Sequence, residues 1–389
     1  MMKRIFLLFC LLFCLLPTLA WAASTLPSGM ENPLPLRYPE LATAPAPPML
    51  KEGLRATYNV MASTSETERS ENIEWGTGKP GYGLSQVDVV ALEGGKAATY
   101  TLPYAPDLQG AMRQMAGFGS LPPAGCGDFW CSPAVLGRIA EQASDEFTVQ
   151  RVTYSLGGEN YQAIRFDIRK DTFEMALVYD LDTGLMLYHT VDYTSYTTNP
   201  QLQTIGASAT HGMYELRNLR QVNIPWKDGD VPSWLVPGSA LYYQGQTAIQ
   251  VQGASPTASP ISVQVSVLGA QKRYAEVRID TYTQDGVPAP YINTVSGIAQ
   301  LLGNWIPPAA IALSPGEIDS DPDTGMVTSL LQSDDNGVVF EKTNQVDFRG
   351  LYHYDKSGRL LEMYNEYNPD VITSAGFGSI KIIDVKLVG

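Results

Sequence analysis

The 389-residue chain carries the same series of sequence blocks twice, and this internal repeat limits its fold more than any other feature. The segment Leu50–Tyr58 aligns without gaps with Leu235–Tyr243, with Leu, Gly and Tyr at the same positions in both. Further blocks match in the same order in the two halves. They are Val87–Leu92 with Val263–Leu268, Trp130–Ala134 with Trp305–Ala309, Tyr179–Leu187 with Tyr354–Leu361, and Tyr214–Leu219 with Ile380–Val385.

Several matches in one shared order indicate a duplicated unit rather than chance similarity. We therefore expect residues 49–226 and 235–389 to form two homologous modules of ordinary domain size. Residues 227–234, which include Pro, Gly and Asp, have the polar character of a short linker between them.

Strand patterns dominate both halves. Apolar and polar residues alternate along Ile261–Val267, Ile164–Ile168 and Val277–Asp280, which is typical of strands with one buried and one wet face. Helical spacing of apolar residues is found at 107–118, 133–143 and 290–303, and the two Tyr-Asp blocks are typical of hairpins. The sequence therefore predicts a mainly β (β-rich α+β) fold. Each of the two tandem modules is expected to be a curved antiparallel sheet with one or two short helices.

The N-terminus predicts export. Lys3 and Arg4 precede the apolar stretch Ile5–Leu16, and Ala20 and Ala22 stand at the −3 and −1 positions of a cleavage site. Residues 1–22 thus resemble a cleaved signal peptide, with an uncleaved anchor or a lipoprotein signal as alternatives. Export places the protein in the periplasm or, alternatively, in the external medium. Residues 23–48 are rich in Pro and are expected to form an extended tail that acts as a spacer.

Cleavage would leave Cys126 and Cys131 as the cysteines of the mature chain. Two nearby cysteines in an exporting compartment predict a structural disulfide. The alternatives are a redox pair or half of a metal site. Both fit less well, because the spacing is wider than C-x-x-C and no further zinc ligands lie nearby.

The charge excludes one class of partner. The chain has a formal net charge of −14, so we expect no nucleic-acid ligand. After the signal segment, no stretch is long and apolar enough for a membrane span, and no transmembrane anchor is expected in the mature chain.

One acidic segment resembles half of a calcium-binding loop. Asp319, Asp321 and Asp323 alternate along a turning backbone, an arrangement in which carboxylates can converge on a hard cation. The alternative is an Asp/Pro/Gly turn between strands, since Gly325 and Pro322 depart from the loop pattern. Apart from calcium, the sequence predicts no cofactor.

Two tryptophans recur at one position of the repeat. Trp130 and Trp305 are candidates for a ligand-facing platform, with core packing as the alternative. His189, His211 and His353 lack metal-site spacing and are expected to be polar residues at strand edges. No nucleophile or phosphate-binding motif is present, whereas the plentiful carboxylates leave open a paired-acid hydrolase.

The general plan, an exported curved sheet with a small helix against it, is similar to that of the periplasmic lipoprotein carriers of the LolA kind. This resemblance is one of architecture and implies no particular site residues. The leading hypothesis is a non-enzymatic binding protein of the bacterial envelope. Its partner would be an apolar or lipid-linked ligand held between each sheet and its helix, or an envelope protein. The alternatives are an extracellular surface or matrix protein that contacts polysaccharide and a carboxylate-dependent hydrolase.

Overall fold

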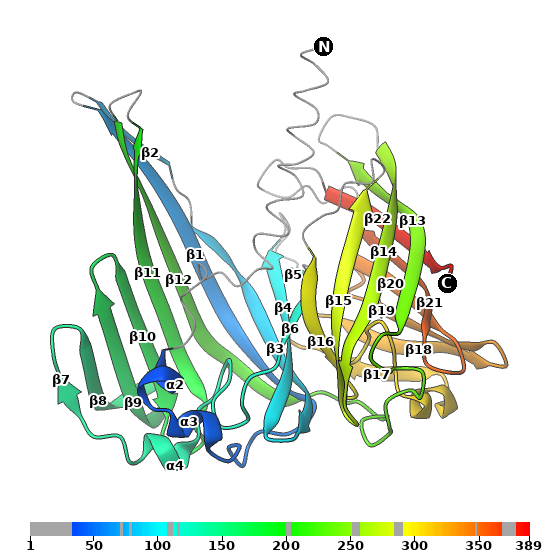
Figure 1. Cartoon of the computed structure of the whole chain (residues 1–389), viewed down its shortest axis with the longest axis horizontal. Coiled ribbons are helices and arrows are strands. Elements are labelled where there is room, and N and C mark those ends of the chain that lie inside the picture. Colours follow the sequence, from blue (N-terminus) through cyan, green and yellow to red (C-terminus); the bar gives the residue numbers. More distant parts are fainter. Residues whose placement is uncertain are drawn as a thin grey trace.

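The computed structural model describes residues 33–389 except 71–72, 78–79, 107–111, 115–116, 200–203, 251–256, 284–290, 347 and 368–378. The predicted signal peptide and residues 23–32 of the predicted tail lie outside this range. Two antiparallel sheets lie side by side, the first from the N-terminal half and the second from the C-terminal half (Figure 1). No helix in the described ranges is long and apolar enough to cross a membrane.

Within the described residues, twelve strands make the first sheet, in the order β5-β4-β3-β1-β12-β11-β10-β9-β8-β7, with β2 beside β1 and β6 beside β4. The strands are β1 (Leu54–Ser70), β2 (Ile73–Thr77), β3 (Gly81–Glu93), β4 (Lys96–Pro106), β5 (Met112–Gln114), β6 (Phe118–Ser120), β7 (Gln142–Ala143), β8 (Phe147–Leu156), β9 (Glu159–Lys170), β10 (Phe173–Asp180), β11 (Met186–Asn199) and β12 (Thr204–Gln221).

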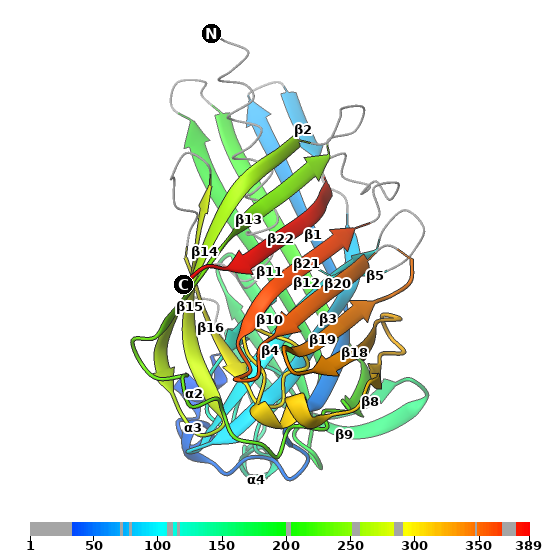
Figure 2. The same ribbon diagram turned by 90° about the vertical axis from the view of Figure 1, so that its right-hand side faces the viewer.

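Ten strands of the described residues make the second sheet, in the order β16-β15-β14-β13-β22-β21-β20-β19-β18-β17 (Figure 2). The strands are β13 (Ala240–Gln250), β14 (Thr257–Ala270), β15 (Tyr274–Thr283), β16 (Ile292–Gly297), β17 (Gly316–Ser320), β18 (Val327–Asp334), β19 (Gly337–Thr343), β20 (Phe348–Tyr354), β21 (Leu360–Tyr367) and β22 (Ser379–Leu387).

The two sheets have the same topology. In each, the first strand pairs with the last in the middle of the sheet, β1 with β12 and β13 with β22. The remaining strands follow outward in matching order on both sides. The predicted mainly β fold of two homologous modules with antiparallel sheets is therefore confirmed.

Individual contacts repeat as well. The hydroxyl of Tyr58 donates to the carbonyl oxygen of Met186 at 2.9 Å, and that of Tyr243 donates to the carbonyl oxygen of Leu360 at 3.1 Å. Tyr58 and Tyr243 are aligned in the repeat, and each anchors the first strand of its module to the second strand of the Tyr-Asp hairpin. The repeated tyrosine thus has the same structural role in both modules.

The hairpins β10–β11 and β20–β21 form where the Tyr-Asp blocks predict them. Gly184 and Gly358 occupy their turns with φ of +77° and +78°, which L-residues other than Gly rarely adopt. A Cβ at Gly184 would lie 1.9 Å from the carbonyl oxygen of Cys131, and one at Gly358 would lie 2.1 Å from that of Ile306. Each turn therefore requires glycine for two reasons, the left-handed backbone conformation and the lack of space for a Cβ.

The described helices are shorter than those that the sequence predicts, and only one of them lies where a helix is predicted. The described helices are α2 (Leu34–Arg37), α3 (Glu40–Thr43), α4 (Pro133–Leu136) and the 3-10 helix η1 (Pro308–Ala312). The prediction of helices at 107–118 and 290–303 is wrong where these residues are described, because they contain strands β5, β6 and β16. The predicted helix at 133–143 ends after one turn. Edge pairing with a neighbouring strand outweighs the helical spacing of a few apolar residues.

Two segments pack differently from the sequence expectation. Residues 33–48 are not an extended tail, because α2 and α3 place Leu34 and Leu41, both 0% exposed, in the core of the first module. After β12 ends, Val222, Ile224 and Trp226 belong to the core of the second module. The chain therefore leaves the first module at Gln221, before the linker predicted at 227–234.

The first sheet has two faces with different partners. Directly paired residues on neighbouring strands project to the same side. We call the inner face the one that carries Tyr58, Phe166 and Leu177, which belong to the core of the first module. The outer face carries Arg55 and Asp88, which are paired in register on β1 and β3.

The outer face of β3 and β4 packs against the second module. Leu84, Leu102 and Tyr104 share a buried cluster with Met326 and Phe348. A second cluster joins the two modules near β16, and its buried members are Val90, Ala91, Ala98, Tyr274 and Val295. The amide of Ala299 also donates to the carbonyl oxygen of Val90 at 2.9 Å. The two modules therefore share an apolar interface.

Candidate functional site

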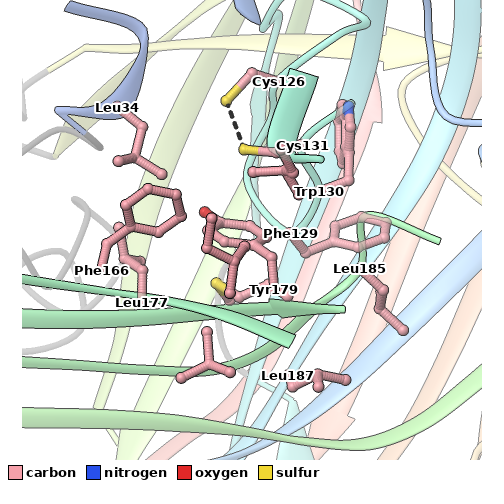
Figure 3. Packing of buried hydrophobic residues seen from close by; sticks show 14 of the residues in the cluster. Leu34, Cys126, Phe129, Trp130, Cys131, Phe166, Leu177, Tyr179, Leu185 and Leu187 are labelled. Carbon is pink, nitrogen blue, oxygen red and sulfur yellow. Dashed lines mark hydrogen bonds between the residues drawn. The ribbon is translucent and has the colours of Figure 1, made fainter. Parts of the chain in front are cut away.

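The space between the first sheet and its helices is filled. Phe129 and Trp130 enter it from the loop before α4, and Phe166, Leu177 and Tyr179 come from the sheet (Figure 3). Each of these five side chains is at most 2% exposed. A ligand between this sheet and its helices, as the sequence suggested, would have to displace the core.

Trp130 and Trp305 are core residues, with exposed fractions of 0% and 3%. Each forms an isolated β-bridge to its module's Tyr-Asp hairpin, Trp130 with Leu185 and Trp305 with Arg359. The indole of Trp130 donates to the carbonyl oxygen of Ala124 at 2.8 Å. The geometry therefore favours core packing, and neither ring forms a ligand platform.

A different part of the inner face lies beyond the helices. The helices gather at one end of the first sheet, while β1, β11 and β12 continue past them (Figure 1). On the inner face of these three strands Val60, Tyr193 and Tyr214 are only partly buried and pack against the core. We call this surface, together with His189, the inner-face patch.

His189 lies in the middle of the inner-face patch. It is paired in register with Leu177 on β10 and with Tyr214 on β12, so it is not at a strand edge as predicted. Its ring stacks on that of Tyr214 with centroids 5.9 Å apart. Burial lowers the pKa of His189 to about 4, so the imidazole is neutral at physiological pH. Its Nε2 is buried and has no hydrogen-bond partner among the described residues.

The other two histidines do not join this group. His211 projects from the outer face, where its Nδ1 lies 2.7 Å from a carboxylate oxygen of Asp192. His353 pairs in register with Glu362 on the second sheet. The structure thus separates the three histidines.

The acidic segment Asp319–Asp323, which begins at the end of β17, contacts arginines of the first module. Asp319 accepts two hydrogen bonds of 2.9 Å from Arg220, and Asp323 accepts one of 2.9 Å from Arg217. Asp321 is 2% exposed and pairs with Arg55 and, at 3.1 Å, with Arg220. Each carboxylate that the sequence assigned to calcium therefore has a guanidinium partner.

These pairs belong to a larger buried network. Arg55 also donates to both carboxylate oxygens of Asp88 at 2.6 and 2.7 Å, and Gln86 donates to Asp321 at 2.8 Å. Burial acts to raise the pKa of Asp321, but Arg55 and Arg220 hold it well below its usual range. The carboxylate therefore stays charged. We call Arg55, Asp88, Arg220, Asp319 and Asp321 the intermodule ion network.

This arrangement gives the calcium hypothesis no support. In the described part of the chain, no group of three or more His, Cys, Asp or Glu side chains is placed to hold a metal ion. The acidic segment matches the alternative expectation of an Asp/Pro/Gly turn between strands, here β17 and β18. Its carboxylates serve the contact between modules.

Cys126 and Cys131 face each other across a short loop. They form an isolated β-bridge, and their Sγ atoms lie 3.1 Å apart (Figure 3). This exceeds the roughly 2.05 Å of a disulfide bond, so the structure describes two buried thiols. Burial raises the pKa of Cys131, which disfavours the reactive thiolate. The predicted disulfide thus remains a prediction.

The sequence reasoning missed the arginines of the ion network and the role of His189. One pattern in the sequence does indicate that the outer face of the first sheet is covered. Val87–Leu92 carries apolar residues on both faces of β3, which is typical of a strand buried on both sides. An outer face buried in this way implies that Arg55 and Asp88 are also covered.

Comparison with known proteins assigns no family. No family model matches the chain, and no curated protein matches it. A solved structure of a protein with unknown function from the DUF3598 family of Nostoc punctiforme is similar over 84% of this chain and 95% of that chain. Its sequence identity is 10% and its TM-score is 0.16, so the match carries no argument about fold or function.

Proposed function

We propose that the protein is an exported, non-enzymatic binding protein of the bacterial envelope that holds an apolar ligand on the inner-face patch. The predicted signal peptide supports export to the periplasm. The mainly β fold provides a long, partly uncovered inner face on the first sheet. Because the space under the helices is filled, the ligand lies farther along the strands than the sequence suggested.

The observation that carries this proposal is His189. A neutral imidazole with an unpartnered, buried Nε2 in apolar surroundings is costly unless a ligand group completes its hydrogen bonding. Aromatic and aliphatic side chains around it supply apolar contact, and the ring nitrogen supplies one polar contact. A lipid-like molecule with a single polar group matches this combination. With a pKa of about 4, His189 is a weak base at neutral pH, which favours binding over proton-transfer catalysis.

The test is a titration with N-phenyl-1-naphthylamine, an apolar probe whose fluorescence rises in a dry site. We expect the purified full chain to enhance the fluorescence. Val60→Glu, which puts a charge on the inner-face patch, should lower probe affinity at least tenfold. The matched control is Leu268→Glu, at a side chain 54% exposed on the second sheet, and should bind like wild type. Equal binding by both variants, with melting temperatures unchanged, would contradict the proposal.

The protonation of His189 gives a second readout. The folded pKa of about 4 lies below the usual value of about 6.5, so the unfolded chain takes up a proton first as the pH falls. Stability should therefore weaken between about pH 6.5 and 4, whereas probe binding by the folded protein should weaken only as the pH approaches 4. His189→Phe should remove this component while keeping the ring stack on Tyr214.

Export also predicts that Cys126 and Cys131 are joined by a disulfide in the protein from the periplasm. Two thiols would lose two hydrogens to a disulfide-bearing oxidant, which is reduced to two thiols in exchange. Since the folded thiols are buried, the bond should form before the loop closes. Intact-mass measurement after denaturation and alkylation, without reductant, checks this. Alkylation of both cysteines would show that the disulfide is absent.

A further inference from the structure

A hollow of about 320 Å³ lies on the second sheet where β13, β14 and β22 run side by side. Its lining is more apolar than polar, because Gly245, Ala258 and Pro260 and the carbon atoms of the longer side chains contribute to it. The polar groups come from Gln244, Gln246, Ser259, Asp384 and Lys386. This volume is at the lower end of the range for small-molecule sites. The hollow is separate from the inner-face patch, which belongs to the first sheet.

The strand register sets the spacing of the polar groups. Gln244 pairs with Lys386, and Gln246 pairs with Asp384. The side chains therefore stand in two rows, about 4.8 Å apart across strands and about 6.7 Å apart along them. Gly245 lies between the two glutamines, and a Cβ there would be 1.8 Å from the carbonyl oxygen of Asp384. Glycine thus lets β13 approach β22 closely at the hollow.

Asp384 has unused hydrogen-bonding capacity. Its Oδ1 is buried and has no partner among the described residues. The hydrogen bond to Glu362 at 2.9 Å and the charge of Asp384 both raise the pKa of Lys386, but the ammonium group pairs with Glu362 and leaves the Oδ1 of Asp384 without a hydrogen bond from this side chain. Tyr364 is the register partner of Asp384 on the other side, on β21, and adds an aromatic ring to the surroundings.

We propose that this hollow binds a neutral saccharide. Hydroxyl groups both donate and accept hydrogen bonds, which matches two primary amides, a serine hydroxyl and a free carboxylate oxygen. An anionic ligand would be repelled by Asp384. A simple cation would use the carboxylate but leave the amide donors without partners. The spacing of the two rows is comparable to the spread of hydroxyls on one sugar ring.

The test is affinity electrophoresis of the full chain in gels that contain dextran, a β-1,4-glucan or a polymer of N-acetylglucosamine. We expect one or more of these neutral polysaccharides to retard wild type. Gln246→Ala and Asp384→Ala should each weaken retardation about tenfold, the effect of losing roughly 1.4 kcal/mol of hydrogen bonding. Asp335→Ala is the matched control, since it removes an equally charged but exposed carboxylate in the turn between β18 and β19.

Three results would overturn the assignment. The first is no retardation by any neutral polymer. The second is retardation only by charged polymers run in parallel. The third is retardation that stays unchanged in both hollow variants. Val60→Glu, which tests the inner-face patch, should leave retardation intact, so the saccharide site and the apolar site can fail independently.

Discussion

Replacing Asp321 with alanine is expected to destabilise the protein by about 3 kcal/mol, because it leaves the buried Arg55 and the partly buried Arg220 without the carboxylate that they share. Arg55 is 4% exposed and cannot recover its hydration. The measurement is urea unfolding followed by tryptophan fluorescence and by circular dichroism. Asp335→Ala removes a fully exposed member of a surface pair and should leave the unfolding midpoint unchanged.

The pH dependence provides an independent check. Because the folded pKa of Asp321 lies below its unfolded value, its stabilising contribution is present above pH about 4 and is lost as the pH falls towards the folded pKa. The stability curves of wild type and Asp321→Ala should therefore converge in acid. If the variant unfolds at the wild-type urea concentration at pH 7, the intermodule ion network is not a stabilising contact.

Alanine at Gly184 or Gly358 is expected to cost about 3 kcal/mol or more in either module. An L-residue in the left-handed region costs about 1–2 kcal/mol, and displacing the neighbouring carbonyl adds the loss of a buried hydrogen bond of about 1–3 kcal/mol. The backbone amide of Cys131 donates to the carbonyl oxygen of Gly184 at 2.8 Å, and that of Ile306 donates to the carbonyl oxygen of Gly358 at 3.0 Å. Pushing the Cys131 or Ile306 carbonyl aside would move the same residue's amide and break this bond.

Gly157→Ala separates these two effects. Gly157 has φ of +61°, but a Cβ there would contact nothing within 4 Å. Only the backbone cost of about 1–2 kcal/mol should remain. Thermal or urea unfolding of the three variants gives the comparison. If the free energy of unfolding of Gly184→Ala equals that of Gly157→Ala, the turn of the β10–β11 hairpin does not pack against the backbone of Cys131 as described.

The sequence predicts the repeated elements well because each rests on local chemistry. Alternation along Ile261–Val267 and the Tyr-Asp turns require no knowledge of the partner strand. Helical spacing at 290–303 was misleading, because Ile292–Gly297 satisfies its backbone by pairing with β15. A short apolar pattern cannot distinguish a helix from an edge strand that finds a partner.

The candidate sites were harder to predict for a different reason. Arg55 and Asp321 are far apart in the chain and meet only because the outer face of one sheet is covered by the other module. In the sequence, Arg55 has the pattern of an ordinary outward-facing residue on a half-buried strand. In the sequence, the acidic segment resembles half of a calcium-binding loop. In the structure its carboxylates pair with arginine guanidinium groups instead of a cation. The sequence predicts that His189 lies at a strand edge. Its actual neighbours, Leu177 and Tyr214, are on other strands and cannot be identified from the residues around His189 in the chain.

The pairing of first with last strands has a consequence for how each module is completed. The β1–β12 pair is the seam that joins the two halves of the first sheet. Until β12 is available, the strands on either side of this seam remain two separate meanders. The same holds for β13 and β22. Each module therefore depends on its most sequence-distant contact for a continuous sheet, which is a topology of slow folding. A chain shortened by its final strand would keep most of its hairpins yet have lost the seam that joins them into one layer.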